Sequence, residues 1–356
     1  MENPSLAGLT PSELEEILSP LPRFRVMQIY SWIMRGACGF DQMTDIPKSL
    51  RNDLKNRFSF FSGSIVICND DRADSKKSDA KKIALLLKDS LKTESVLLND
   101  GKTRFTACLS VQAGCQAGCV FCKTGSLGFK RNLTSSEIVE QFLHLQIMRL
   151  ETTERKTDDS HIIENIVLMG MGEPLLNLEN LRKAVSVFTD PKGLNISRRR
   201  ITLSTCGICA GLSDIAEKGP FVRLALSLTT ADENLRRKLM PISKTNPLEK
   251  IKEAIIRFQQ NGGGRVTLEI PLLGRINTRE RDAILTAEFA KGMDCVINII
   301  PWNPVPGLNF ENKPLIEPEK KEIEEFIKML EGNGLKTVKR LGKGRSVMGA
   351  CGQLGA

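Results

Sequence analysis

The sequence has few histidines, no long apolar run and no internal repeat. His144 and His161 are its only histidines, and neither lies near a recognisable carboxylate or serine signature, so histidine-based hydrolysis is not expected. No run reaches the ~18 apolar residues that a membrane helix needs. The acidic start, MENPSLAGLTPSELEE, lacks the basic and apolar regions of a signal peptide. We therefore expect a cytoplasmic protein without membrane association.

The composition is that of a globular protein with a sizeable core. Its 356 residues are 41% hydrophobic and 26% charged, and the length suits one barrel plus a small accessory domain. In the reducing cytoplasm, the ten cysteines indicate metal or redox chemistry more than disulfides. The net charge of +9 favours a polyanionic partner such as nucleic acid.

Residues 1–90 carry helical patterns that set them apart from the rest of the chain. The segments PSELEEIL, RVMQIYSWIMRG and PKSLRNDLKNRF have apolar residues at helical spacing, with Pro11 and Pro47 suited to first turns. The runs KKIALLL and TESVLL then predict strands. We expect three parts: an N-terminal helical accessory domain with linker strands (1–90), a barrel (91–340) and a C-terminal tail (341–356).

From about residue 105, short apolar runs alternate with amphipathic helices. Strands are predicted at 105–111, 163–170, 199–205, 221–228, 265–273 and 295–301. Helices are predicted at 134–150, 178–188, 247–260, 278–292 and 318–334. Thr134 and Glu137 form a capping box at the start of the first of these helices. Such units join by right-handed crossovers, which predicts an α/β fold, a partial (β/α)6 barrel that binds ligands at the carboxyl ends of its strands.

Three cysteines form a CxxxCxxC motif, Cys115, Cys119 and Cys122, directly after the first predicted barrel strand. A structural zinc site needs a fourth cysteine or histidine and usually shows paired CxxC spacing, and neither is adjacent. Three thiolates suit instead a four-iron cluster with one iron left open for a small molecule. The motif therefore predicts a 4Fe-4S cluster.

With Phe121 before its last cysteine, this motif resembles the signature of the radical S-adenosylmethionine (SAM) superfamily. The segment MGMGEP (169–174) follows the second predicted strand, and its Gly172, Glu173 and Pro174 match the superfamily motif that binds the SAM amino group. The resemblance implies that the open iron binds SAM and that electron transfer into the sulfonium releases a 5′-deoxyadenosyl radical.

The chain further resembles the family of radical SAM enzymes that methylate adenine in ribosomal RNA. Family motifs occur in order over nearly the whole chain: CLSVQAGC, FCKTGSLGFKRNLTSSEI, GMGEPLLN, ITLSTCG, LALSL, LMPI, IIPWNP and ACGQL. The resemblance implies methylation of adenine C2 in 23S rRNA, and in tRNA next to the anticodon.

In this family two cysteines carry the methyl group and release the product, and the resemblance assigns these roles to Cys351 and Cys108. Cys351, in a catalytic C-terminal tail, would take a methyl group from one SAM, because a thiolate is the competent nucleophile. A radical from a second SAM would remove hydrogen from the S-methyl group, and the carbon radical would add to the ring. A disulfide between Cys108 and Cys351 would then expel the methylated RNA.

The resemblance also implies a base and several SAM contacts. Glu94 falls where the family has a proposed base for the ring proton, with its spacing to Cys108 shifted by about one residue; the alternative is an exposed strand carboxylate. Thr229 stands where the family commonly has a histidine, so we expect only backbone contacts from this residue. The sequence also lacks an acidic residue that the family often has before the alanine of the tail. The implied SAM contacts at strand ends are Ser204, Ser227, Leu228, Thr229 and Asn303.

The implied partners are 23S rRNA in a protein-poor or free form, tRNA, and a flavodoxin-type electron donor. Basic residues gathered around one mouth of the barrel would bind RNA phosphates, and the target adenine would have to be unpaired or flipped out. The candidates are Lys123, Lys130, Arg131, Arg198, Arg199, Arg200, Lys336, Lys339, Arg340, Lys343 and Arg345. The remaining cysteines are expected to be packed thiols, because free cysteine is usually buried: Cys38, Cys68, Cys206, Cys209 and Cys295.

Three other functions remain open. A paralogous enzyme that methylates adenine C8 and confers ribosomal antibiotic resistance uses the same cysteines, although IPWNPVPG looks more like the C2 group. A zinc-stabilised RNA-binding protein would have no catalysis. A radical SAM enzyme acting on a protein or small molecule would keep the cluster but give Cys351 no role.

Overall fold

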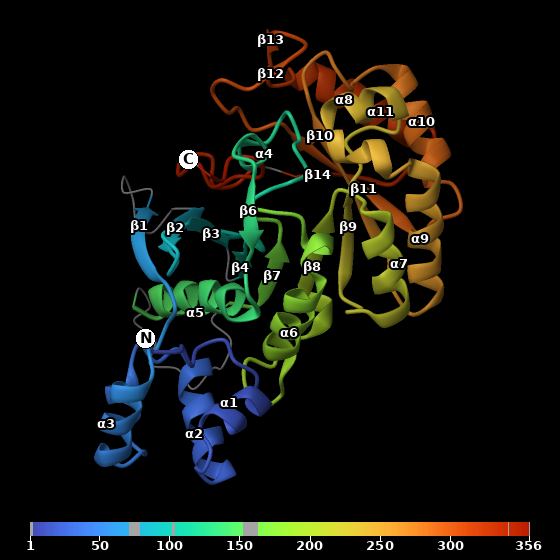
Figure 1. Cartoon of the computed structure of the whole chain (residues 1–356). Coiled ribbons are helices and arrows are strands. Elements are labelled where there is room, and N and C mark those ends of the chain that lie inside the picture. Colours follow the sequence, from blue (N-terminus) through green and yellow to red (C-terminus); the bar gives the residue numbers. More distant parts are fainter. Residues whose placement is uncertain (1–2, 71–78, 102–103, 152–162, 341, 356) are drawn as a thin grey trace.

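One ten-stranded sheet organises the computed structural model, which describes residues 3–70, 79–101, 104–151, 163–340 and 342–355 (Figure 1). Its strands lie in the order β1-β2-β3-β4-β7-β8-β9-β10-β11-β14. Their bounds are β1 Ser64–Asp70, β2 Ala80–Leu86, β3 Lys92–Asn99, β4 Phe105–Cys108, β7 Asn165–Leu168, β8 Ile201–Thr205, β9 Arg223–Ser227, β10 Val266–Leu272, β11 Cys295–Pro301 and β14 Thr337–Lys339.

The part of the sheet from β4 to β14 is parallel and forms the predicted partial barrel. Helices of the β/α units separate its strands along the chain, so the expected α/β fold with six strand–helix units is confirmed for the described residues. The helices of this region are α5 Ser135–Glu151, α6 Leu178–Thr189, α7 Cys209–Lys218, α8 Glu233–Leu239, α9 Leu248–Gln260, α10 Glu280–Ala290 and α11 Lys320–Gly332.

The start of α5 shows why the sequence places a helix there. The Glu137 backbone N–H donates to Thr134 Oγ1 over 3.2 Å, and the Thr134 N–H donates to the Glu137 carboxylate over 2.8 Å. This is the predicted capping box, which satisfies two backbone donors that the first turn leaves free. The helix then buries Ile138, Phe142 and Leu145 in the core.

Strands β1, β2 and β3 extend the barrel sheet in antiparallel fashion. The sequence predicts β2 and β3 but misses β1 and β14. The apolar run Ile65, Val66 and Ile67 of β1 is itself a strand signal that the prediction passed over, and in the structure these side chains are exposed at the edge of the sheet. Strand β14 has only three residues. Two small hairpins pair β5 Gln112–Gly114 with β6 Phe129–Asn132, and β12 Asn309–Phe310 with β13 Lys313–Pro314.

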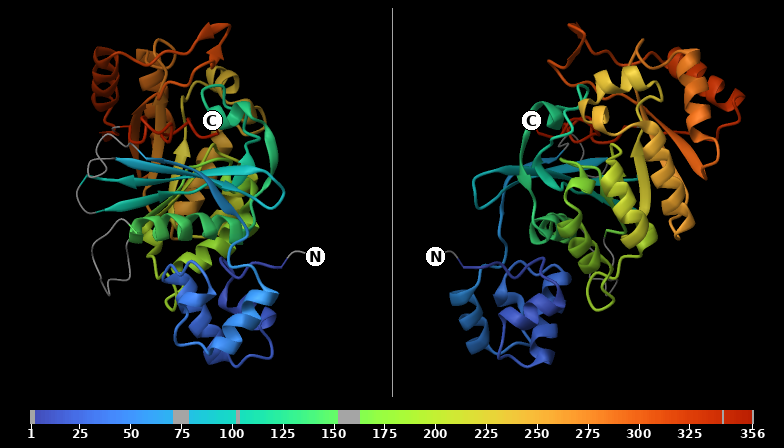
Figure 2. Two further views of the ribbon diagram at one scale, coloured as in Figure 1. Left: turned by 90° about the vertical axis from the view of Figure 1, so that its left-hand side faces the viewer. Right: turned by 45° about the vertical axis from the view of Figure 1, so that its right-hand side comes forward.

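The N-terminal helices form a separate group below the barrel, as the views in Figure 2 show. They are α1 Pro11–Ile17, α2 Arg23–Met34 and α3 Lys48–Arg57, which confirms the predicted helical patterns. Glu140 of α5 binds the chain segment that precedes these helices and the segment that follows them. Its buried carboxylate accepts hydrogen bonds from Ser5 Oγ at 2.8 Å, Ser62 N at 2.8 Å and Gly63 N at 3.2 Å. The division of the chain into the three predicted parts stays a prediction.

The C-terminal tail, residues 342–355, contains no helix or strand and lies beside the short helix α4, Lys123–Ser126 (Figure 2). The Lys123 N–H donates to Gly352 O over 2.8 Å, and Thr124 Oγ1 donates to Leu354 O over 2.7 Å. The tail is thereby held against the carboxyl ends of the barrel strands. The remaining helical turns are η1 Phe40–Gln42, η2 Pro174–Leu176, η3 Arg198–Arg200 and η4 Pro241–Thr245. None of the described helices is both long and apolar enough to span a bilayer.

Candidate functional site

Two adjoining cavities lie at the carboxyl ends of the barrel strands. The smaller, about 180 Å³, is lined by residues in the carboxyl halves of β7, β8, β9, β10 and β11 or just after them, and by the cysteine motif. The larger, about 600 Å³, is lined by β4, β14 and the tail. Four residues line both and mark where they meet: Met169, Ile300, Asn303 and Cys351. Cavities thus lie where the sequence predicts ligand binding, and the binding itself stays a prediction.

Cys115, Cys119 and Cys122 all line the smaller cavity. They are held by local contacts: Cys115 N donates to Gly128 O, and Cys122 N donates to Cys119 O. Burial raises the pKa of the Cys115 thiol to about 12, and burial also raises the pKa of Cys119 and Cys122. Thiols in such surroundings stay protonated unless a metal draws off the proton.

The donor set of this cavity fits an iron–sulfur cluster. Each thiolate of such a cluster binds a different iron, so its ligands line a common cavity and need not meet at one point. Within the described residues, no three histidine, cysteine or carboxylate side chains gather where one metal ion would sit. The side of the cavity away from the cysteines is lined by Gly172, Glu173, Ser204 and Ser227, which leaves polar groups for a ligand of the open iron.

Gly172 and Glu173 line this cavity immediately after β7. Gly172 has a φ of 100°, and a Cβ there would lie 2.5 Å from Gln112 Cβ, so only glycine fits. The Glu173 carboxyl is 4% exposed and accepts from the N–H groups of Leu175 at 3.0 Å and Cys206 at 2.8 Å. Burial raises its pKa, and these hydrogen bonds oppose the rise. The carboxylate is therefore fixed in direction and able to pair with a cation.

Of the other predicted SAM contacts, some reach the cavity and some do not. Ser204 and Ser227 line it with hydroxyl oxygens 3.4 Å apart, and Asn303 lines both cavities. Leu228 and Thr229 line neither. Thr229 is fully buried with a φ of 64°, and its backbone bonds to Glu269 and Asn277 instead. Side-chain contact at these two positions is thus not seen.

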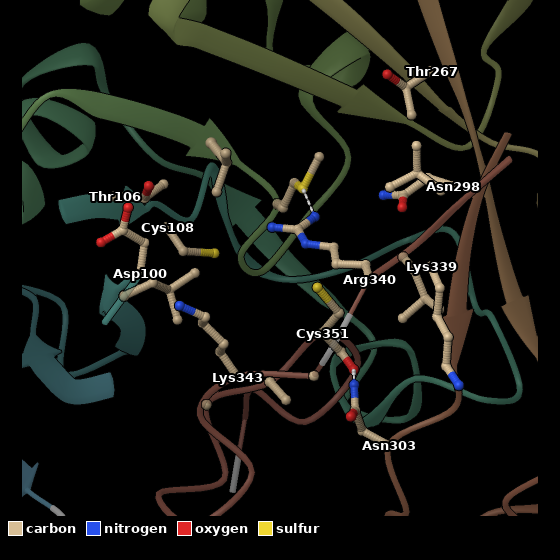
Figure 3. A pocket seen from close by; sticks show the side chains of 18 of the residues that line it. Asp100, Thr106, Cys108, Thr267, Asn298, Asn303, Lys339, Arg340, Lys343 and Cys351 are labelled. Carbon is tan, nitrogen blue, oxygen red and sulfur yellow. Dashed lines mark hydrogen bonds between the residues drawn. The ribbon is translucent and has the colours of Figure 1, made fainter. Parts of the chain in front are cut away.

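Cys108 and Cys351 both line the larger cavity, with Arg340 reaching into the same space (Figure 3). Cys108 ends β4, and Cys351 is fixed by the hydrogen bond from Asn303 Nδ2 to its carbonyl at 3.0 Å. Burial and the neighbouring Cys351 raise the pKa of Cys108 to about 12, whereas Arg340 lowers it. Protein around the cavity also raises the pKa of Cys351, and Arg340 again opposes the rise. On balance the pKa of both thiols is raised, and the guanidinium lessens this rise without reversing it.

Glu94 lies in β3 and lines neither cavity. Its carboxylate is 4% exposed, which excludes the exposed strand carboxylate considered from the sequence. It accepts from Lys82 Nζ at 3.3 Å and from the Gly355 N–H at 2.7 Å. Lys82 also donates to Met348 O at 3.3 Å. In this structure Glu94 therefore anchors the tail.

The sequence analysis missed several residues of the smaller cavity. Glu269 in β10 lines it with a buried carboxyl that accepts from Asn298 Nδ2 at 2.8 Å, and burial raises its pKa. A lone carboxylate in the apolar run RVTLEIPLL was the available signal. Trp302 lines the cavity too, and its Nε1 donates to Phe121 O at 2.9 Å, which ties β11 to the cysteine motif. No local pattern indicates that contact.

The basic residues do not gather around one mouth. Lys339, Arg340 and Lys343 line the larger cavity. Arg198 and Arg199 precede β8 and line a third cavity, about 770 Å³, that adjoins the larger one and shares Arg340 with it. Arg131 is held by Glu137 and Asp89, and Arg345 by Glu317 and Asn303. Four of the eleven candidate residues therefore lie toward the amino ends of the strands or are used in structural contacts.

The expectation that the remaining cysteines are packed is partly wrong. Cys206 is buried and lines the smaller cavity, while Cys209 and Cys295 are half-buried. Cys38 and Cys68 are exposed, because they lie in a loop and on the outermost strand β1. Of the two histidines, His144 is buried against Phe61 with ring centres 4.2 Å apart, and His161 falls outside the described residues.

Family models match both parts of the chain. The model of the radical SAM superfamily matches residues 109–287, which include the cysteine motif and the segment around Glu173. The model described as the ribosomal RNA large subunit methyltransferase N-terminal domain matches residues 5–59, which include helices α1 to α3.

Relatives match almost end to end. The probable dual-specificity RNA methyltransferase RlmN of Treponema denticola is 47% identical over 352 residues, covering 99% of this chain and 95% of the relative. The dual-specificity RNA methyltransferase RlmN of Nitratiruptor is 38% identical over 363 residues, covering 98% and 97%. The crystal structure of a radical SAM methyltransferase from Sphaerobacter thermophilus matches with a TM-score of 0.89 at 34% identity, covering 98% of both chains.

Proposed function

Because this chain belongs to the RlmN family of radical SAM RNA methyltransferases, we propose that it methylates carbon 2 of adenine in 23S rRNA and in tRNA next to the anticodon. The proposal includes an S-methylcysteine intermediate on Cys351 and the use of two SAM molecules per turnover. One observation carries it: Cys351 lies where the cysteine-lined cavity meets the larger one, so one thiol borders both.

This position suits a thiol that must serve two cavities. SAM bound beside Glu173, Ser204 and Ser227 would be next to Cys351, because all four line the smaller cavity. The larger cavity offers about 600 Å³ for an adenine and brings in Cys108. Arg340 opposes the burial that raises the pKa of Cys351, and a thiolate is the nucleophile needed for direct methyl transfer.

We assign the cluster to Cys115, Cys119 and Cys122, and the SAM amino group to Glu173. When bound, the cluster would supply the electron that splits SAM, taken from a flavodoxin-type donor. Glu173 would orient the SAM ammonium group, since its carboxylate is already fixed by two backbone N–H donors. Asn303 would hold the tail in place through the Cys351 carbonyl.

Glu94 stays our candidate for the base that removes the ring proton. Its carboxylate is held by Lys82 and by the Gly355 N–H, so it becomes accessible to the larger cavity only when the end of the tail moves away. Cys108 would then close a disulfide with Cys351 and release the RNA. Lys339, Arg340 and Lys343 would contact RNA phosphates at the mouth of this cavity. Both RNA substrates are cytoplasmic, where we place the enzyme.

Anaerobic methylation of protein-free 23S rRNA fragments and of tRNA tests the function. The reconstituted enzyme, SAM and a flavodoxin reducing system are incubated with each RNA, and the nucleosides are separated by mass spectrometry. We expect 2-methyladenosine in both RNAs. Formation of 8-methyladenosine would assign the chain to the paralogous activity, and an RNA free of new methyl groups would refute methyl transfer to RNA altogether.

A further inference from the structure

Arg236 of α8 is a buried cation that forms no direct ion pair with a carboxylate among the described residues. Its side chain is fully buried. Its Nε donates to Leu228 O at 3.1 Å and its Nη2 donates to Cys206 O at 2.6 Å, both backbone carbonyls. Its Nη1 is buried with no acceptor among the described residues. The carboxylate of Glu233 in the preceding turn acts on Arg236 without bonding to it, and burying a charge without a direct ion pair is costly, so the arrangement needs an explanation.

The two hydrogen bonds join the strand ends that border the smaller cavity. Cys206 follows β8 and Leu228 follows β9. The Cys206 N–H in turn donates to the Glu173 carboxylate at 2.8 Å. Arg236 therefore helps to fix the backbone of Cys206: it binds the carbonyl of this residue, and the N–H of the same residue orients Glu173.

The same helix also contacts the cysteine motif. The Val120 N–H, between Cys119 and Cys122, donates to Leu239 O at the end of α8 over 3.0 Å. Cys206, whose carbonyl accepts the hydrogen bond from Arg236, lines the cysteine-lined cavity. Helix α8 therefore contacts both the wall of this cavity, through Arg236, and the cysteine motif, through Leu239.

We propose that Arg236 is the counter-ion of the iron–sulfur cluster: a positioning residue whose charge holds the cluster and eases its reduction. This inference rests on the proposed function, because it requires the cluster at the three cysteines. A cluster bound by three thiolates carries a net negative charge, which grows by one when an electron arrives from the external donor. A fixed, buried positive charge stabilises the reduced form more than the oxidised form, since little solvent screens it.

Three variants test the charge. Arg236→Met removes it, Arg236→Lys keeps it but loses the planar fork, and Arg237→Met removes the charge of the exposed neighbour on the same helix as a matched control. Each protein is reconstituted anaerobically, and its iron content and cluster reduction potential are measured. Far-UV circular dichroism of the cluster-free proteins monitors the fold.

We expect Arg237→Met to match the parent protein. Arg236→Met should reduce the equilibrium constant for cluster reduction at least about tenfold, a shift of about 59 mV to more negative potential for one electron, or should fold yet fail to hold iron. Arg236→Lys should retain the iron and lie closer to the parent.

The inference is overturned if Arg236→Met keeps its iron and its potential, if Arg236→Lys is as impaired as Arg236→Met, or if cluster-free Arg236→Met is unfolded while the cluster-free parent is folded. The last result would assign Arg236 to the fold alone. Failure of the parent protein to bind iron would refute the proposed function itself, and so is distinct from these outcomes.

Discussion

The cysteine motif and the C-terminal tail bring thiols to the same place by different means. The motif, residues 115–122, lies between β5 and α4 and is held mainly by backbone hydrogen bonds, from Cys115 to Gly128, from Cys122 to Cys119 and from Val120 to Leu239, with one side-chain bond from Trp302 to Phe121. The tail has no helix or strand over 342–355. It is held by side chains from distant parts of the chain: Glu94 to Gly355, Lys82 to Met348, Thr124 to Leu354, Asn303 to Cys351 and Gln353 to Pro304.

This difference suits their proposed roles. A cluster needs ligands that do not move, whereas Cys351 has to meet SAM, substrate and Cys108 in turn. A neutral hydrogen bond of the tail contributes only about 1 kcal/mol and a charged one about 2 kcal/mol, so part of the tail can open without unfolding the barrel. The tail buries Val347 and Leu354 in a small separate cluster, whereas the motif belongs to the continuous main core that includes Cys115.

The largest expected effect comes from breaking the motif. Cys119→Ala leaves two thiols for the cluster, so we expect the loss of nearly all bound iron and of all methylation. Iron analysis after anaerobic reconstitution measures this. Cys209→Ala is the matched control, because Cys209 is half-buried and lines neither cavity. Full iron in Cys119→Ala would show that Cys119 is not a ligand.

Removing the thiol of the tail should leave the cluster at the cysteine motif intact. For Cys351→Ala we expect normal iron and SAM binding, with RNA methylation reduced by at least about a thousandfold because the nucleophile is gone. Cys108→Ala should instead accumulate protein covalently joined to RNA, visible by gel electrophoresis. Cys295→Ala, which removes a half-buried thiol in β11, serves as the control. Undiminished methylation by Cys351→Ala would rule out the two-cysteine mechanism.

Glu94→Gln should loosen the tail without affecting the cluster. The change keeps an acceptor for Gly355 but leaves the buried Lys82 ammonium without its carboxylate. We expect the tail to open about thirtyfold more often, equivalent to about 2 kcal/mol for a charged hydrogen bond. Tryptic cleavage at Lys343 and Arg345, followed by mass spectrometry, reports this opening. Glu164→Gln removes a carboxylate that binds Phe105 N instead of the tail, and cleavage as fast as in Glu94→Gln would contradict the anchoring role.

The smallest effect is expected from Gln353→Met. The variant loses the bonds from Gln353 Nε2 to Pro304 O at 3.0 Å and from Ala350 N to Gln353 Oε1 at 3.2 Å, while the side chain keeps its length. The two lost hydrogen bonds, about 1 kcal/mol each, are partly offset by the apolar surface that the methionine buries, which leaves about 1 kcal/mol and about fivefold faster tail opening in the same cleavage assay. No change in cleavage would mean that these contacts do not hold the tail.

The difference between the cysteine motif and the tail also explains which features could be predicted from the sequence. The predicted helices and strands, and the motifs containing Cys115 and Glu173, follow from local patterns, and the structure contains them, although the prediction leaves out α7, α8, β1 and β14. The tail contacts of Glu94 and the burial of Arg236 depend on segments far apart in the chain, so no local pattern carries them. Arg198 and Arg199 lie at the amino end of β8, which their place before the predicted strand at 199–205 already indicated, so grouping them with residues at the carboxyl ends was not justified by the sequence. Glu269 could have been found as a lone carboxylate in an apolar strand.

The most direct test of the account is the electron paramagnetic resonance spectrum of the reduced, anaerobically reconstituted protein with and without SAM. We predict the signal of a 4Fe-4S cluster with about four irons per chain, and a clear change in that signal when SAM binds the open iron. A protein without an iron–sulfur signal, or a signal that SAM leaves unchanged, would contradict the central claim.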